Sequence, residues 1–189
     1  MSEELLIQHC APTLAGIKTG SLFSCPITDE RELRESLGRL NRLLVKKGLR
    51  VLPLRVENGR ALIYVYRPQR LKRDLSHQTA ARLLNERNYT TLSSDRCVLE
   101  LINRLKDHEE FPHEIGLFLG YPPEDVDGFI THRAANSKLA GTWKVYGNVD
   151  EAQKTFARYK KCTDVYRAHF ADGTPIERLA VAEACHPTR

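Results

Sequence analysis

Residues 111–147 read FPHEIGLFLGYPPEDVDGFITHRAANSKLAGTWKVYG, and the pattern of this stretch decides the expected fold of the chain. Pro112 suits the first turn of a helix, and Gly120 followed by a proline suits the end of that helix. A second short helix is expected to begin at Pro123, followed by a polar loop and a strand over 142–146. The stretch therefore predicts a corner of two short helices packed beside a strand.

The two short helices also resemble a helix-turn-helix, which is a motif that reads DNA. The second helix argues against that use, because Glu124, Asp125 and Asp127 stand at its leading end. A recognition helix meets the phosphate polyanion there and needs Lys or Arg. A helical corner is the simpler interpretation, with Trp143, the single tryptophan, anchoring the core from one face of the strand.

The composition is that of a globular protein, with 41% apolar and 28% charged residues. A length of 189 residues allows a substantial core, so residues 1–189 are expected to form a single domain. The sequence contains no run of about eighteen apolar residues, and its acidic start MSEELLIQHC differs from a signal peptide. We therefore expect a cytoplasmic protein without a membrane partner.

The net charge of +5 is unevenly distributed. Residues 31–106 hold 18 Lys and Arg against 7 Asp and Glu, whereas the rest of the chain holds 11 against 17. A basic middle region attracts nucleic acid, nucleotides or another acidic partner. The same composition is also typical of the solvated faces of arginine-rich helices, so both interpretations stay open.

Outside the central stretch, Asn58-Gly59 predicts a hairpin turn between two strands. The segment 11–26 is expected to be a loop, because two prolines and two glycines interrupt it. Helices are expected at 30–47, 77–88, 95–107 and 151–170, with a helix or a strand-like tail at 175–184 among the C-terminal helices of 150–189. Strands are expected at 5–10, 51–56, 61–67 and 142–146. These elements predict an α+β fold, with a small, mostly antiparallel sheet of about four strands and helices covering one face.

Several segments together resemble one bacterial family. They are CAPTLAGIKTGSLFSC (10–25), the hairpin, FPHEIGLFLGYPPEDVDGFI (111–130), GTWKVYG (141–147) and FARYKKCTDVY (156–166). The resemblance is to domain-of-unknown-function family 3793, found mainly in anaerobic Gram-positive bacteria, and it covers nearly the whole chain. It implies a single-domain cytoplasmic protein of about this length. It supplies no activity, ligand or catalytic residue.

The five cysteines are odd in number, scattered and without a Cys-x-x-Cys pair, which argues against a disulfide framework and a zinc ribbon. They are Cys10, Cys25, Cys97, Cys162 and Cys185. No metal site is predicted. Cys10 is a candidate nucleophile, because it is expected to end a strand before a helical turn, where a helix N-terminus lowers a thiol pKa. The alternative is a small buried apolar side chain.

A set of polar residues is the candidate ligand site: Lys18, His113, Glu114, Lys138, Lys144 and Tyr146. Lys144 and Tyr146 share one face of the expected strand, where an ammonium group and a hydroxyl could bind an anion. A desolvated Lys144 could also act as a Schiff-base or general-base lysine, and His113 could serve Cys10 as a base. The other interpretation is an exposed sheet face with ordinary polar residues.

Three classes of function follow from these features. The leading one is a binding or regulatory domain for a small, anionic molecule or a protein partner. The second is a small enzyme that depends on Cys10 or Lys144. The third is nucleic-acid binding through the helix-turn-helix-like segment or the basic middle region. The sequence indicates no particular cofactor and no oligomeric state.

Overall fold

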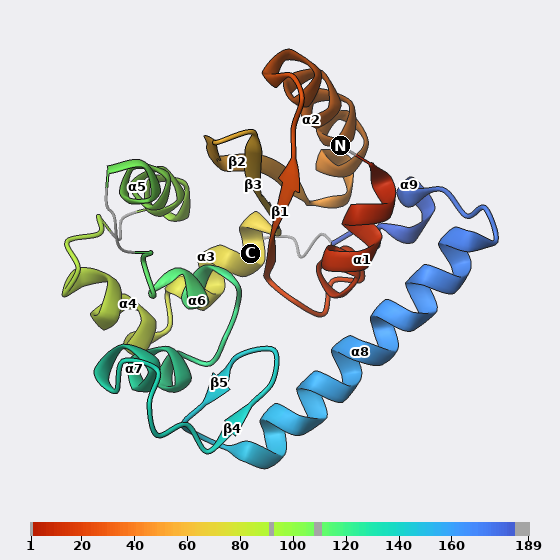
Figure 1. Cartoon of the computed structure of the whole chain (residues 1–189). Coiled ribbons are helices and arrows are strands. Elements are labelled where there is room, and N and C mark those ends of the chain that lie inside the picture. The colour runs from red at the N-terminus through yellow and green to blue at the C-terminus, as the bar shows by residue number, and fades with distance from the viewer. Residues whose placement is uncertain (1, 91–92, 108–110, 184–189) are drawn as a thin grey trace, which may run out of the picture.

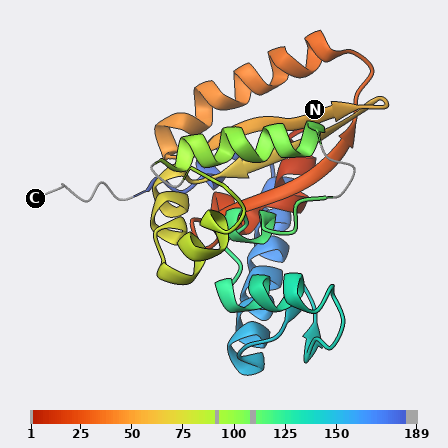
Figure 2. The same ribbon diagram turned by 90° about the vertical axis from the view of Figure 1, so that its left-hand side faces the viewer.

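The computed structural model describes residues 2–90, 93–107 and 111–183. At its centre is a three-stranded antiparallel sheet of order β1-β3-β2 (Figures 1 and 2), built from β1 (Gly20–Pro26), β2 (Arg50–Glu57) and β3 (Arg60–Tyr66). Asn58 and Gly59 join β2 to β3 with φ of 49° and 69°, which is the backbone that a tight hairpin needs. The predicted hairpin is therefore confirmed.

The sheet separates two hydrophobic cores. Along β3, Ala61, Ile63 and Val65 face the first core, whereas Tyr64 and Tyr66 face the second, as the two-residue period of a strand requires. An irregularity in the pairing of β2 with β3 lies between Pro53 and Arg55, and Leu54 at that point joins the second core. Both faces of the sheet are therefore buried.

The first core is covered by helices from both ends of the chain. They are α1 (Glu3–Leu14), α2 (Glu30–Leu44) with the 3₁₀ turn η1 (Val45–Lys47), and α9 (Ile176–Leu179). The long helix α8 (Val149–Ala171) packs along α1 and runs from the region of β4 and β5 towards α9 (Figure 1). Ile176 and Leu179 are buried in this core, so the chain after Thr174 docks as far as the described residues extend.

The second core is covered by helices from the middle of the chain. They are α3 (Pro68–Leu75), α4 (Gln78–Asn85), α5 (Ser94–Asp107), α6 (Ile115–Phe118) and α7 (Pro123–Thr131). The helix α7 packs on a separate two-stranded sheet of β4 (Leu139–Ala140) and β5 (Lys144–Val145). In Figure 2, α7, this sheet and the start of α8 lie below the three-stranded sheet.

The α+β class with a small antiparallel sheet is confirmed, but helices cover both faces rather than one. The strand expected at 5–10 is wrong, because these residues lie in α1. Leu6, Ile7, Cys10 and Leu14 are buried at helical spacing, and Ser2 caps the helix start by accepting a hydrogen bond from the Leu5 amide.

The loop expected at 11–26 is also largely wrong, because residues 11–14 complete α1 and residues 20–26 form β1. Gly20 is not a breaker there. A Cβ at this position would lie 2.6 Å from the Phe118 carbonyl oxygen and from the Tyr64 ring, so glycine permits close packing. Pro26 ends an edge strand, where its missing amide hydrogen costs little.

The strand expected at 142–146 shrinks to β5, whose partner β4 lies in the segment predicted to be a loop. Trp143 does not anchor either core. It is half-buried and lies between the rings of Tyr121 and Phe156, at centroid distances of 4.8 and 4.5 Å. Among the described residues, no helix has the length and apolarity to cross a membrane.

Candidate functional site

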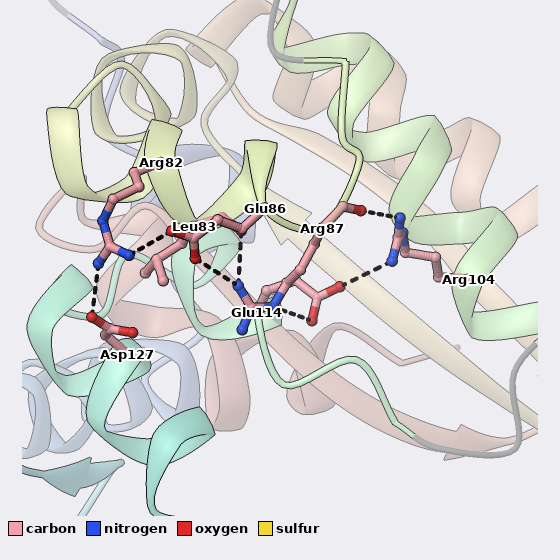
Figure 3. A network of polar contacts seen from close by, with 7 residues as sticks. All are labelled: Arg82, Leu83, Glu86, Arg87, Arg104, Glu114 and Asp127. Carbon is pink, nitrogen blue, oxygen red and sulfur yellow. Dashed lines mark hydrogen bonds and ion pairs between the residues drawn. The ribbon is translucent and has the colours of Figure 1, made fainter.

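A buried carboxylate, Glu114, lies directly before α6 and faces two arginines (Figure 3). The Tyr89 hydroxyl donates a hydrogen bond of 3.0 Å to Oε1 of Glu114. Arg104 Nη1 lies 3.8 Å from Oε1, and Arg87 Nε lies 3.9 Å from Oε2. Burial, followed by the charge of Glu114, raises the pKa of Tyr89, so its hydroxyl stays a donor. Two cations thus share one carboxylate at distances longer than hydrogen bonds.

Other contacts hold both guanidinium groups in place. Arg87 Nη1 donates to the Leu83 carbonyl oxygen at 2.9 Å, near the end of α4. Arg104 donates from Nη2 to the Arg87 carbonyl oxygen and from Nε to Glu100 at 3.1 Å. The Arg104 guanidinium also lies 4.5 Å from the centre of the Tyr89 ring. Contacts within the protein therefore fix the positions of both guanidinium groups.

These arginines line an open hollow of about 770 Å³, which we call the arginine hollow. Its lining also contains His113, Glu114 and Arg133, together with the apolar residues Phe111, Pro112, Phe129, Ile130 and Ala134. Arg133 is exposed, and in the part of the chain that the structure describes its side chain makes no ion pair and no hydrogen bond. The lining thus holds three guanidinium groups and one carboxylate. Outside the lining, Glu86 lies 3.9 Å from Arg87 and Glu100 lies 3.1 Å from Arg104, so among the described residues Arg133 is the lining arginine without a paired carboxylate.

A second hollow of about 370 Å³ adjoins the first and shares Phe111, His113 and Phe129 with it. We call it the apolar hollow, because most of the remaining lining is apolar or aromatic: Ile115, Gly116, Tyr121, Val126 and Trp143. The His113 ring meets the Phe129 ring edge-on, with centroids 5.0 Å apart. The common wall of the two hollows is thus aromatic.

The residues predicted to form a polar patch are only partly brought together. Lys144 Nζ donates to the Ala134 carbonyl oxygen at 2.5 Å, and the Tyr146 hydroxyl donates to the next carbonyl oxygen at 3.0 Å. Lys138 Nζ donates to the Gly147 carbonyl oxygen at 3.0 Å. These three side chains brace the loop that follows α7. Only Lys144 among them also lines the apolar hollow, beside His113.

The acidic start of α7 is used inside the molecule. Asp125 is buried, and its Oδ1 accepts hydrogen bonds of 2.7 Å from the backbone amides of Tyr146 and Gly147. Its Oδ2 accepts a hydrogen bond of 2.7 Å from Trp143 Nε1. Asp127 forms an ion pair of 2.8 Å with Arg82 of α4 (Figure 3). Asp125 therefore organises the β5 segment, a role that its position in a first helical turn did not reveal.

Cys10 lies in the middle of α1 and is fully buried, not exposed at a strand end. Burial raises the pKa of its thiol to about 12, which is the opposite of the expected thiolate. His113 lines hollows on the second-core side of the sheet, whereas Cys10 belongs to the first core. The described cysteines are free thiols, and Cys185 lies outside the described residues. Over 2–90, 93–107 and 111–183, no group of three metal-ligating side chains occurs.

Lys18 is separated from the other predicted ligand residues. It lies between α1 and β1, is only 8% exposed, and lines a third hollow of about 310 Å³ with residues of α1 and α8. The predicted ligand residues thus fall into four places: His113 and Glu114 at the arginine hollow, Lys144 at the apolar hollow, Lys138 and Tyr146 at the loop after α7, and Lys18 alone.

Arg87, Arg104 and Arg133 are the site residues that sequence reasoning did not identify. Arg87 and Arg104 belong to the basic region 31–106, but charge counting does not separate them from solvated surface arginines. Their distinguishing feature is the shared contact with Glu114, and this contact joins segments far apart in the sequence.

A comparison with protein families shows that the chain belongs to the family described as protein of unknown function DUF3793, whose model matches residues 6–180. The family resemblance found in the sequence is therefore confirmed. No curated protein and no solved structure matches the chain.

Proposed function

We propose that this member of DUF3793 binds a small molecule that carries both an anionic group and an apolar group. The observation that carries the proposal is the lining of the arginine hollow, which holds Arg87, Arg104 and Arg133 but only one carboxylate, Glu114, at 3.8 to 3.9 Å from the first two. A carboxylate or phosphate ester group suits planar guanidinium donors, which bind two oxygens at once.

The positioning of the arginines supports an anion rather than a cation as the ligand. Arg87 and Arg104 are held by carbonyl oxygens and by Glu100, while their contacts with Glu114 are 3.8 to 3.9 Å long. Guanidinium hydrogen atoms therefore remain available toward the hollow. Arg133 adds an exposed cation to the lining, which suits ligand capture.

The apolar hollow supports an apolar group on the same ligand. It adjoins the arginine hollow through Phe111, His113 and Phe129, and Trp143 is part of its lining. Pockets of this kind bind the body of a ligand through apolar contacts and orient it through a few polar groups. A molecule with an aromatic or aliphatic body and one acidic group fits both hollows together.

The test uses three matched probes: 1-naphthyl phosphate, 1-naphthol and inorganic phosphate. We expect the phosphate ester to bind more tightly than either fragment, because it alone occupies both hollows. Titration calorimetry measures the affinities, and the fluorescence of Trp143 reports contact with the apolar hollow.

The variant Arg133→Gln should weaken binding of the ester by about five- to ten-fold, because a charge-assisted contact is lost at an exposed position. Arg42→Gln is the matched control, since Arg42 is an exposed arginine of α2 on the other side of the sheet. Equal binding of the ester and 1-naphthol, or equal losses in the two variants, would contradict the proposal.

A further inference from the structure

Lys18 is a buried amine without an anionic partner. Its side chain is 8% exposed, and it lines the 310 Å³ hollow between α1 and α8, which we call the lysine hollow. Over the residues that the structure describes, Nζ of Lys18 makes no hydrogen bond and no ion pair. Its neighbours are instead the rings of Tyr121 and Tyr159, whose centroids lie 5.3 and 5.8 Å from Nζ.

The groups around the lysine hollow do not supply a counterion. Cys10 interacts with Lys18, but burial raises its thiol pKa to about 12, so the thiol stays neutral. The one carboxylate in the lining, Asp164, already forms an ion pair of 3.2 Å with Lys160. His9 and four hydroxyl-bearing residues complete the polar lining: Ser21, Thr142, Tyr159 and Thr163.

Burial therefore acts on Lys18 with no anionic partner to offset it, and it disfavours the charged form. Desolvation lowers the pKa of the ammonium group from 10.5 to about 8. A lysine in this condition is partly neutral near physiological pH, and a neutral amine is a nucleophile. Stabilisation of the fold does not require such an amine, because a lysine buried for packing is usually paired.

We propose that Lys18 is a reactive amine that forms an imine with a small aldehyde or ketone bound in the lysine hollow. The proposal rests on the burial of Lys18, its lack of an anionic partner and its position in a hollow of 310 Å³. It is independent of the anion site, because no lining residue is shared between the lysine hollow and the arginine hollow.

The chemistry needs no cofactor and no oxidant. The lone pair of neutral Nζ adds to the carbonyl carbon, the carbonyl π bond breaks, and its oxygen takes up a proton to give a carbinolamine. The hydroxyl group then leaves as water with a proton from nitrogen, and a carbon–nitrogen double bond forms. Nearby hydroxyls and the imidazole of His9 are suited to relay these protons.

The experiment traps the imine on the native protein. The full chain is incubated at pH 8 with limiting propanal or, in parallel, glyoxylate, together with cyanoborohydride, which reduces the imine to a stable secondary amine. Peptide mass mapping then gives the labelling rate of each lysine. We expect Lys18 to be labelled at least ten-fold faster than Lys161, because an exposed lysine is almost fully protonated at this pH.

Two variants complete the test. Lys18→Arg keeps the positive charge but has no amine that forms an imine, so fast labelling should disappear. Lys138→Arg removes a lysine whose amine donates to a carbonyl oxygen outside these hollows, and fast labelling at Lys18 should persist. Labelling of Lys18 no faster than that of Lys161 in the unmodified chain would overturn the proposal. An unchanged rate of total labelling of the protein in Lys18→Arg would also overturn it. Faster labelling by glyoxylate than by propanal would support the proposal and identify an acidic carbonyl compound as the preferred class.

Discussion

Two buried cations near the end of α1 have opposite surroundings. Arg67 follows β3, is 1% exposed and donates hydrogen bonds to the carbonyl oxygens of Thr13 and Leu14 at 2.8 Å each. It also donates to the carbonyl oxygens of Val181 at 2.7 Å and Lys47 at 3.2 Å. Lys18 is nearly as buried, but among the described residues its amine lies near the rings of Tyr121 and Tyr159 and makes no hydrogen bond or ion pair.

The difference separates a cation that builds the fold from a cation that is available for chemistry. Arg67 ties together the last turn of α1, the end of η1 and the segment after α9, so four backbone acceptors depend on it. Carbonyl oxygens at helix ends carry partial negative charge, which suits a guanidinium group. Among the described residues, Lys18 has no comparable set of acceptors, so only its two cation–π contacts offset the cost of burying its charge.

The largest expected effect comes from removing the satisfied cation. Arg67→Met leaves up to four buried carbonyl oxygens without a donor, and we expect the free energy of unfolding to fall by about 3–5 kcal/mol. Urea denaturation followed by circular dichroism measures this loss. Arg42→Gln is the control and should change stability by no more than about 0.5 kcal/mol. A loss below about 1 kcal/mol for Arg67→Met would remove the contrast with Lys18.

Asp125 is a buried carboxylate with full hydrogen bonding, so its substitution should also lower the free energy of unfolding, but by less than that of Arg67. In Asp125→Asn, the new amide group faces either the Trp143 Nε1 donor or the two backbone amides that Asp125 now binds. We expect the free energy of unfolding to fall by about 1–3 kcal/mol. The fluorescence of Trp143 should shift to the red, because β5 becomes less tightly held. Asp127→Asn is the control, because its ion pair with Arg82 is exposed and should contribute less than about 1 kcal/mol. Equal losses in the two variants would contradict this assignment.

The sequence predicted those parts of the fold that local signals determine. Asn58-Gly59 identified the hairpin, and the helix expected at 30–47 begins after Asp29, whose side chain accepts from the Arg31 amide at 2.8 Å. Gly48 ends the following η1 turn with φ of +76°, as expected of a glycine at a helix end. Each of these features depends on residues within a few positions of each other.

The errors arose where distant contacts decide. The short apolar run LLIQHC suits a strand or a helix equally, and burial against the first core selects the helix α1. The composition of the candidate sites was missed for the same reason. Glu114 meets Arg87 and Arg104 from separate segments, and Lys18 meets Tyr121 and Tyr159, which lie far from it in the sequence. The sequence indicated which residue types could form a site, but it did not indicate which side chains they contact in the fold.

Removing the unsatisfied cation should have a smaller effect of opposite sign. Lys18→Met keeps the volume of the side chain and removes the cost of a desolvated charge, while two cation–π contacts are lost. We expect the free energy of unfolding at pH 7 to rise by about 1–2 kcal/mol. Urea denaturation of both proteins under identical conditions measures the difference. A clear destabilisation would mean that Lys18 serves the fold as Arg67 does.

The smallest expected effect is the pH dependence of that gain. Below pH 8 the folded and unfolded chains both bind the Lys18 proton, so the full cost of burying the charge is present. Between pH 8 and 10.5 the unfolded chain binds more protons, so the stability contribution of Lys18 rises with pH.

The difference in free energy of unfolding between Lys18→Met and the unmodified chain should therefore shrink by about 1 kcal/mol between pH 7 and pH 9. Cys10 acts in the opposite sense, because its folded pKa is raised to about 12 and the unfolded thiol ionises above pH 9. That contribution is present in both proteins, as are those of His9, Tyr121 and Tyr159, so the difference between the two unfolding curves isolates Lys18. Denaturation at pH 7, 8 and 9 measures it. A gain that stays constant over this range would mean that Lys18 keeps its proton throughout, as Arg67 does, and the two buried cations would then differ in their contacts but not in their chemistry.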